Sequence, residues 1–168
     1  MFDHSDVRSN FPILSRQVNG KPLVYLDNGA SAQKPQVVID AISTAYSHEY
    51  ANVHRGLHYL SNLATDKYEN VRSIIARFLG VADERQIIMN SGTTEGINTV
   101  AYGWAMPRLQ PGDEILLSIM EHHANIVPWH FLRERQGVVV KWVETDAEGG
   151  LDPQTVIDAI TPRTKLLA

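Results

Sequence analysis

Ile87-Ile-Met-Asn-Ser-Gly-Thr-Thr-Glu-Gly-Ile-Asn98 is the stretch that decides the fold. It opens within a short run, Gln86–Asn90, that predicts a β-strand. A helical pattern follows at once, since four apolar residues recur at the i, i+3, i+4, i+7 spacing of one helix face: Ile97, Val100, Ala101 and Trp104. Pro107 predicts the end of this helix.

The turn between strand and helix, Ser91–Thr94, therefore lies at a helix N-terminus. Free backbone N–H groups and the positive end of the helix dipole favour an anion there. Gly92 lets a ligand approach the backbone, and one of the hydroxyls of Thr93 and Thr94 is expected to cap the helix. Two interpretations stay open, a phosphate-binding turn and an ordinary capped turn. The turn matches neither the Walker A nor the Gly-x-Gly-x-x-Gly pattern.

Composition narrows the class of protein. The 168 residues suffice for one domain with a sizeable core, and the net charge of −4 gives no support for nucleic-acid binding. No run of eighteen apolar residues predicts a membrane span, and the polar start does not resemble a signal peptide. Without cysteine the chain has neither a disulfide nor a thiol nucleophile. The expected location is the cytoplasm.

Predicted helices and strands alternate along the rest of the chain. Four further helices are predicted. The first begins at Pro35, and the second runs from Ser61 or Asn62 to Leu79 and ends before Gly80. The third spans Val127–Gln136 and ends before Gly137, and the fourth spans Pro153–Ile160. The strands are Glu114–Ile119, Val138–Val143 and Lys165–Ala168. The expected buried faces of the first two helices are Val38, Ala41, Ile42 and Ala45, and Val71, Ile74, Ile75 and Phe78. This order predicts right-handed crossovers and a mainly parallel sheet.

Ligands of such sheets lie beyond the carboxyl ends of the strands. Ser91–Thr94 and His122-His123 both follow predicted strands, so they are compatible with one pocket. One imidazole would stack on a flat ligand or carry a proton; the alternative is a pair of polar loop histidines. The small residues of Asn28–Ala30 fit a ligand-binding loop or a plain surface turn. No metal is predicted at His54, Arg55 and His58, because no third ligand stands at zinc-like spacing.

Four motifs extend this interpretation: Tyr25–Pro35, Val53–Gly56, Gly92–Asn98 and Glu121–Trp129. With these residues the sequence closely resembles the N-terminal part of cysteine desulfurases of the SufS type. Those enzymes are class-V, aminotransferase-like proteins of fold type I that use pyridoxal phosphate (PLP). The resemblance covers the whole chain, and the last two motifs together are specific to this branch.

The resemblance implies roles for particular residues. Thr93 and Thr94 would bind the cofactor phosphate, and His122 would stack on the pyridine ring and transfer protons. Asn28, Gly29 and Ala30 would belong to the substrate cavity. His54 and Arg55 would lie at a homodimer interface near the neighbouring active site. The implied reaction takes sulfur from L-cysteine, gives L-alanine and an enzyme-bound persulfide, and supplies iron–sulfur cluster assembly through a sulfur-acceptor or scaffold protein.

The resemblance also implies an incomplete domain: an arm over residues 1–20, and part of the class-V domain over residues 21–168 that stops after about the fourth strand. None of the lysines, Lys21, Lys34, Lys67, Lys141 and Lys165, matches the context of the lysine that binds the cofactor, and no cysteine is present. The 168 residues alone are therefore expected to be inactive. A selenocysteine lyase or another class-V enzyme, and a non-catalytic binding module, stay open as alternatives.

Overall fold

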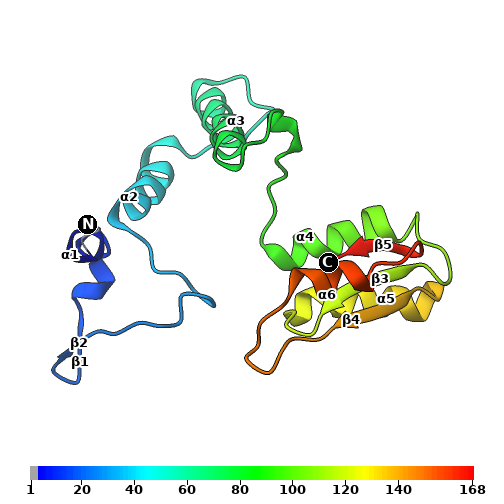
Figure 1. Ribbon diagram of the computed structural model, residues 1–168. Coiled ribbons are helices and arrows are strands. Elements are labelled where there is room, and N and C mark those ends of the chain that lie inside the picture. The colour runs from blue at the N-terminus through cyan, green and yellow to red at the C-terminus, as the bar shows by residue number, and fades with distance from the viewer. Residues whose placement is uncertain (1–3) are drawn as a thin grey trace. The chain divides into compact units, whose positions relative to one another are not determined.

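The computed structural model describes residues 4–168. The chain forms two compact units, the first ending at Ile87 and the second beginning at Ile88 (Figure 1). The second unit, from Ile88 onward, contains a three-stranded parallel sheet. Its order is β4 (Val139–Val143), β3 (Glu114–Ser118) and β5 (Thr164–Leu167). β3 lies in the middle, and all five of its residues are buried, as expected for a central parallel strand.

Two crossovers build this sheet. β3 leads through the 3₁₀ turn η5 (His123–Asn125) and helix α5 (Val127–Gln136) to β4, and β4 leads through α6 (Pro153–Ala159) to β5. Gly137 ends α5 in the left-handed conformation at φ 70°, and Asp152 caps α6 by accepting the Gln154 N–H at 2.9 Å. The predicted mainly parallel α/β sheet is therefore confirmed.

The helical segment before β3 begins as α4 (Thr93–Thr99) and continues as a π-helix, η4 (Val100–Ala105). It packs on the sheet together with α5. The core of this unit consists of Ala101, Ala105, Leu109, Ile115, Leu117, Trp129, Leu132 and Val138. Among the residues expected to form the inner face, Ala101 is fully buried, but Val100 and Trp104 are 43% and 40% exposed. The wider π-turn rotates the face and brings Ala105 inward instead.

The first unit holds mostly helices. Its elements are α1 (His4–Ser9), the 3₁₀ turn η1 (Pro12–Ser15), the hairpin of β1 (Gln17–Val18) and β2 (Lys21–Pro22), α2 (Gln36–Thr44), the π-turn η2 (Ala45–Glu49), α3 (Tyr59–Leu79) and the 3₁₀ turn η3 (Glu84–Gln86). Pro35 is the N-cap of α2, and Gly80 ends α3 at φ 69°, close to the predicted bounds.

Two expectations for this part of the chain are wrong. The predicted strand Gln86–Asn90 does not form: Gln86 ends η3, and within the described residues Ile87–Asn90 pair with no other strand. The sheet therefore has three strands where four were expected. The apolar run has the right residues for a strand, but a strand also needs neighbours for its N–H and C=O groups.

The predicted inner faces of α2 and α3 are also largely exposed. Ile42, Val71, Ile74 and Phe78 have exposed fractions of 52%, 42%, 48% and 88%. Among residues 4–87, only Ser61, Ala76 and Ile87 are buried. Helical periodicity predicts which face of a helix is apolar. It does not show whether another element of the structure covers that face.

Candidate active site

The Ser91–Thr94 turn has a backbone conformation that only glycine adopts readily. Gly92 has φ 143° and ψ 173°, and a Cβ built there meets nothing within 4 Å. The Gly92 N–H donates to Asn90 Oδ1 at 2.9 Å, which fixes the turn from within. Open space therefore lies in front of the backbone at the start of α4, and a ligand group can approach it closely.

Thr93 and Thr94 are the first two residues of α4, and both are exposed. The expected threonine cap is wrong, because Gly92 is the N-cap and no side chain caps the helix. Among residues 4–168 no side-chain partner binds either hydroxyl, and the backbone N–H groups of a first helical turn have no partner inside the helix. Two hydroxyls and adjacent N–H groups therefore form a donor set suited to an anion.

Glu95 limits this donor set. Its Oε2 accepts the Ser91 N–H at 2.7 Å and also binds the Ser91 hydroxyl. These two hydrogen bonds, that of the hydroxyl first, hold the pKa of Glu95 below its ordinary value. Ser91 is thus occupied by a carboxylate, so an anion at this turn would be bound by Thr93 and Thr94. This contact was not predicted from the sequence, although a glutamate in the first turn of a helix is a known capping signal.

His122 follows the carboxyl end of β3 and is the N-cap of η5. Its Nδ1 accepts the Ala124 N–H at 3.1 Å, so the neutral ring carries its proton on Nε2. The His123 ring stands at 90° to it, with centroids 6.2 Å apart. Since α4 lies against η5, the structure brings the helix of Thr93 and Thr94 beside the turn of His122.

A hydrogen-bonded network surrounds this turn. Glu121 Oε1 accepts the Ser118 hydroxyl at 2.7 Å, and Glu121 Oε2 accepts the Asn125 Nδ2–H at 2.8 Å. The Asn125 Oδ1 accepts the Trp129 indole N–H at 3.0 Å. We call Ser118, Glu121, Asn125 and Trp129 the Glu121 network. Sequence reasoning missed it, because its partners three or four positions apart could be recognised only once the 3₁₀ turn was known.

A pocket of about 240 Å³ opens at the carboxyl ends of the three strands. Leu117 and Ser118 of β3, Val143 of β4 and Leu167 of β5 contribute to its lining, with Glu121. This is the edge where parallel sheets bind ligands. Thr93, Thr94 and His122 do not line this pocket, so it is a neighbour of their site.

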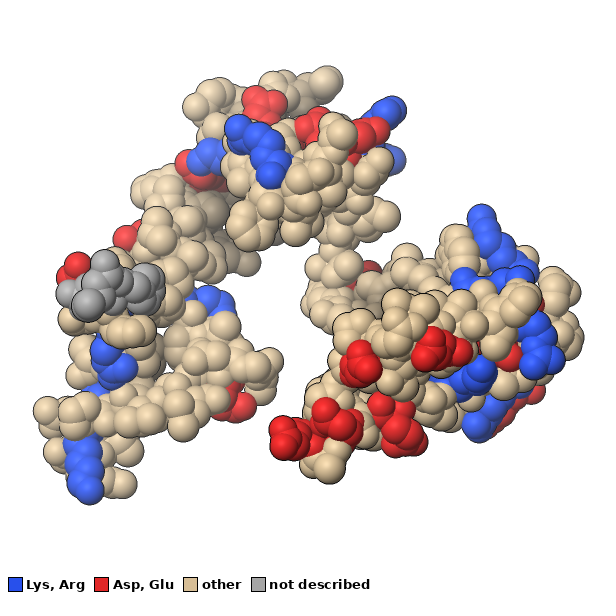
Figure 2. All heavy atoms as spheres, in the orientation of Figure 1, with Lys and Arg blue, Asp and Glu red and all other residues tan. Residues whose placement is uncertain are grey.

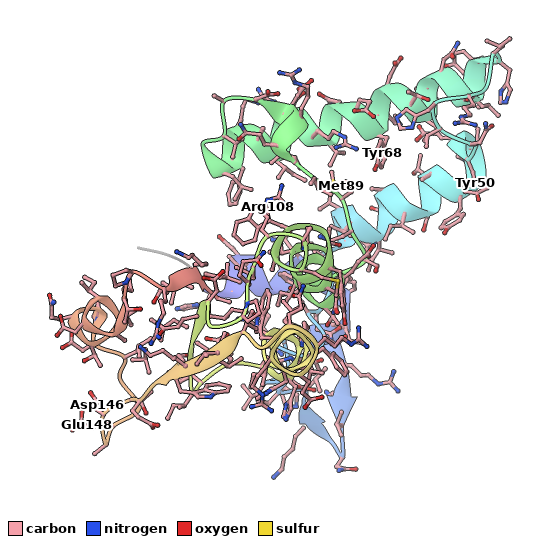
Figure 3. All side chains as sticks on the ribbon, turned by 90° about the vertical axis from the view of Figure 1, so that its right-hand side faces the viewer. Tyr50, Tyr68, Met89, Arg108, Asp146 and Glu148 are labelled. Atoms are coloured by element: carbon pink, nitrogen blue, oxygen red, sulfur yellow. The ribbon has the colours of Figure 1, made fainter. Side chains whose placement is uncertain are left out.

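The loop between β4 and α6 lies at the same edge and is acidic (Figure 2). Asp146 and Glu148 stand at its tip (Figure 3). The Asp146 Oδ1 accepts the N–H groups of Glu148 at 2.9 Å and Gly150 at 2.7 Å, and a Cβ on Gly150 would lie 2.6 Å from Asp146 Oδ2. The loop is therefore closed by its own aspartate.

The expected substrate loop belongs to the first unit. Asn28–Ala30 form a turn in which the Ala30 N–H donates to the Asp27 carbonyl at 3.2 Å, and the Tyr25 hydroxyl donates to the Ser31 carbonyl at 2.7 Å. Asn28 lines a cavity of about 380 Å³ with Arg8, Phe11, Leu14, Tyr25, Ala32 and Gln33. Gly29 and Ala30 do not line it. The assignment of these residues to a substrate cavity stays a prediction.

His54 and Arg55 lie on a loop fastened to the start of α3. His54 has φ 69°, its N–H donates to Thr65 Oγ1 at 2.9 Å, and its Nε2 lies 2.6 Å from Glu69 Oε1. A Cβ at Gly56 would lie 2.2 Å from the hydroxyl oxygen of the buried Ser61, so only glycine fits there. The Arg55 side chain is exposed. Their place at a dimer interface stays a prediction.

Two further expectations concern metals and membranes. Among residues 4–168, no group of three or more His, Asp or Glu side chains is placed to hold a metal ion. In the same residues no helix combines the length and apolar character that a membrane span requires.

The parallel sheet with its helical crossovers defines an α/β domain, in which the N-terminal helix segment α4 lies beside the histidine turn η5. The chain belongs to the aminotransferase class-V family, whose profile matches residues 24–168. The expected boundary between an arm at residues 1–20 and a domain from residue 21 stays a prediction.

Curated relatives align along the whole chain. It is 50% identical over 168 residues to "Probable cysteine desulfurase 1" of Mycobacterium leprae (strain TN), and 49% identical over 167 residues to "Cysteine desulfurase" of Salmonella newport (strain SL254). These alignments cover 100% and 99% of the chain, but 28% and 41% of the two relatives. The chain therefore spans well under half the length of these curated relatives.

Solved structures agree on the fold. The apo cysteine desulfurase of Thermococcus onnurineus NA1 superposes with a TM-score of 0.88 at 35% identity, covering 99% of this chain and 40% of that one. The cysteine desulfurase CsdA of Escherichia coli superposes with a TM-score of 0.80 at 38% identity, covering 99% of this chain and 41% of that one. The chain thus has the same fold as the matching portion of these two cysteine desulfurases.

Proposed function

We propose that the chain is the N-terminal part of a PLP-dependent cysteine desulfurase. This enzyme takes sulfur from L-cysteine, leaves L-alanine, and passes an enzyme-bound persulfide toward iron–sulfur cluster assembly. The observation that carries the proposal is the 49–50% identity, along the whole chain, to proteins named cysteine desulfurase. The donor set at Thr93 and Thr94 beside the His122 turn supports it, because these groups have the chemistry that the family's cofactor needs.

The residues present fit PLP at this site. Its phosphate would bind the hydroxyls and backbone N–H groups of Thr93 and Thr94, which no side chain within residues 4–168 occupies, and Gly92 leaves the approach open. When bound, PLP supplies an electron sink for a bond broken at the α-carbon of an amino acid. The flat imidazole of His122 would lie against the pyridine ring.

His122 is proposed to move a proton through Nε2. Its Nδ1 is already occupied by the Ala124 N–H, so Nε2 is the nitrogen free to give a proton to substrate or receive one. His123 differs, because the Ile126 N–H donates to its backbone carbonyl, at 3.0 Å, and not to its ring. The turn therefore does not fix the His123 ring in the same way. This difference favours His122 as the catalytic histidine.

The remaining assignments belong to the same proposal. Asn28, Gly29 and Ala30 contribute to the substrate cavity, and His54 and Arg55 lie at a homodimer interface near the partner's active site. The protein acts in the cytoplasm, with L-cysteine as substrate and a scaffold or carrier protein as sulfur acceptor. Support for the interface is the loop of His54 and Arg55, which Ser61 and Thr65 hold in a fixed shape on α3.

The test uses the protein expressed from its complete coding sequence. We expect it to purify with the visible absorbance of bound PLP and to release alanine from L-cysteine in the presence of a thiol reductant. Faster turnover of L-selenocysteine than of L-cysteine would favour a selenocysteine lyase. Bound PLP without alanine release would favour a binding module, and a protein without any PLP would refute the proposal.

A further inference from the structure

The segment that carries His122 is fixed on both sides by side chains outside the proposed reaction. Glu121 directly precedes His122, and Asn125 stands three positions after it. The carboxylate of the first and the amide of the second meet at 2.8 Å, so a side-chain contact closes the loop around His122 and His123. The backbone reinforces this closure, since the Asn125 N–H donates to the His122 carbonyl at 2.7 Å.

Each end of this closure is joined to a buried element. The other carboxylate oxygen of Glu121 accepts a hydrogen bond from Ser118, which is the last residue of β3 and is 8% exposed. Asn125 accepts a hydrogen bond from the indole of Trp129 in α5, and the Trp129 side chain is 2% exposed in the core. The Glu121 network thus connects the central strand and the packed helix to the one turn that bears His122.

We propose that Glu121 is a positioning residue: through its hydrogen bonds to Ser118 and Asn125 it sets the orientation of the His122 imidazole. The inference rests on the proposed function and names the group that determines where the catalytic histidine stands. Glu121 acts through geometry, since its two oxygens accept from two donors, one before it and one after it in the chain. Its charge serves no separate purpose.

This role predicts an unusual pattern among variants. In Glu121→Gln the amide oxygen still accepts from Asn125, and the amide NH₂ donates to Ser118, because a hydroxyl can accept as well as donate. The geometry therefore survives the loss of charge. In Glu121→Ala both contacts are lost. In Asn125→Asp the carboxylates at positions 121 and 125 face each other and repel. In the double variant Glu121→Gln/Asn125→Asp, the amide at position 121 donates to the carboxylate at position 125, so the hydrogen bond returns with its direction reversed.

The experiment measures these variants in the complete gene product. Glu121→Ala should lower kcat about 10²-fold, the size associated with a misplacement of about 1 Å. KM for L-cysteine should change far less, and the absorbance and circular dichroism of bound PLP should shift. Glu121→Gln should resemble the unmodified protein. Asn125→Asp should resemble Glu121→Ala, and the double variant should recover about tenfold, within the range of coupling between contacting residues.

Glu134→Ala is the matched control, because Glu134 is an exposed glutamate on α5 whose one ion pair among residues 4–168 is with Arg133, at 3.7 Å. A second readout needs neither cofactor nor turnover: the ¹³C NMR signals of the His122 ring in histidine-labelled protein. These should change in Glu121→Ala and Asn125→Asp but not in Glu134→Ala. If the proposed function fails, this readout still tests the positioning role.

Three results would overturn the inference. In the first, Glu121→Ala lowers the melting temperature but leaves the PLP spectrum, kcat and His122 signals unchanged, which marks a purely structural role. In the second, Glu121→Gln is as damaged as Glu121→Ala, which makes charge the essential property. In the third, the double variant is no better than Asn125→Asp. If Glu121→Ala does not fold, kcat of Glu121→Gln is compared with that of the unmodified protein, where a hundredfold loss overturns the inference, and the third comparison is made as before.

Discussion

The Glu114 carboxylate of β3 accepts a hydrogen bond of 2.7 Å from the hydroxyl of Thr161, which lies 47 positions later in the chain. Arg163 Nη2 and Lys141 Nζ lie 3.1 Å and 3.5 Å from the same carboxylate. Glu114 is 2% exposed, so a single buried acid at the start of the central strand ties β3 to β4 and to the segment that enters β5.

This cluster makes the stability of the sheet pH-dependent. The Thr161 hydrogen bond, with smaller contributions from Thr164, Lys141 and Arg163, holds the pKa of Glu114 below its ordinary value of 4.5. A carboxyl with a lowered folded-state pKa stabilises the fold fully above its unfolded pKa, and this contribution is lost as the pH falls through the folded pKa. Stability should therefore decline below about pH 4.5, close to the pKa of an unfolded glutamate.

Glu114→Gln tests this reading. The variant should unfold at lower urea concentration than the unmodified protein at pH 7, and the difference should shrink as the pH is lowered below about 4.5. Trp104, Trp129 and Trp142 all lie in residues 88–168, so tryptophan fluorescence reports on this unit alone. Glu134→Gln serves as control. A difference that stays constant down to pH 3 would contradict the role of Glu114.

The two units should differ in local stability. Among residues 4–87 only Ser61, Ala76 and Ile87 are buried, whereas β3 is buried throughout. Few buried apolar contacts mean local opening at low free energy. In the 168-residue chain, amides of α3 should exchange with deuterium well before those of β3, and proteases should cut the first unit first. Equal protection of α3 and β3 in hydrogen-exchange mass spectrometry would refute this expectation.

Part of this arrangement could be predicted from the sequence. The strand Glu114–Ser118 could be predicted because its apolar centre, Ile115–Leu117, is typical of a strand buried on both faces. Gly80 and Gly137 end helices because the left-handed conformation favours glycine. These are local causes. The strand expected at Gln86–Asn90 failed for a non-local reason, since no neighbour pairs with it among the described residues.

The candidate site divides in the same way. The place of Ser91–Thr94 before a helix follows from the pattern, and so does the place of His122 after a strand. The N-cap was predicted to be a threonine, but the helix begins after Gly92 without a side-chain cap, while Glu95 binds Ser91. Residue types alone do not decide between these arrangements. The contact of α4 with η5 is tertiary and required the structure.

Thr94→Ala should weaken PLP retention in the complete gene product more than Thr99→Ala does. The Thr94 hydroxyl, at the start of α4, has no side-chain partner in the described part of the chain, whereas the Thr99 hydroxyl already donates to the Glu95 carbonyl at 2.8 Å. A hydrogen bond to a charged group contributes about 1.5–3 kcal/mol, so the loss should be roughly tenfold or more in affinity. Cofactor occupancy after dialysis, read by absorbance, checks it. Equal retention in both variants would remove Thr94 from the phosphate site.

His122→Ala should reduce turnover in the same protein far more than His123→Ala does. General acid–base groups contribute about 10²–10⁴-fold to rate, and only the His122 ring caps η5 through Nδ1. Steady-state alanine release from L-cysteine, at matched PLP occupancy, gives the comparison. If His123→Ala were the slower variant, the catalytic histidine would be the second of the pair.

The 168-residue chain by itself should not release alanine from L-cysteine. It has no cysteine to accept sulfur. The lysines in the unit of the Ser91–Thr94 turn are engaged elsewhere: Lys141 Nζ donates to the Ala159 carbonyl at 3.1 Å, and Lys165 Nζ donates to the Pro162 carbonyl at 2.9 Å. PLP would be bound only by the turn and by stacking. A helix terminus contributes about 0.3–2 kcal/mol, whereas micromolar affinity needs about 8 kcal/mol.

The assay combines purified chain, PLP, L-cysteine and a reductant, with the same mixture lacking protein as control. We expect equal alanine in both, and no visible absorbance retained by the chain after dialysis. Adding Thr94→Ala chain separates a specific effect from adventitious amine chemistry, because that variant keeps every lysine. Alanine release that rises with chain concentration and falls in Thr94→Ala would mean that these residues suffice for the chemistry and that the sulfur leaves without a protein thiol.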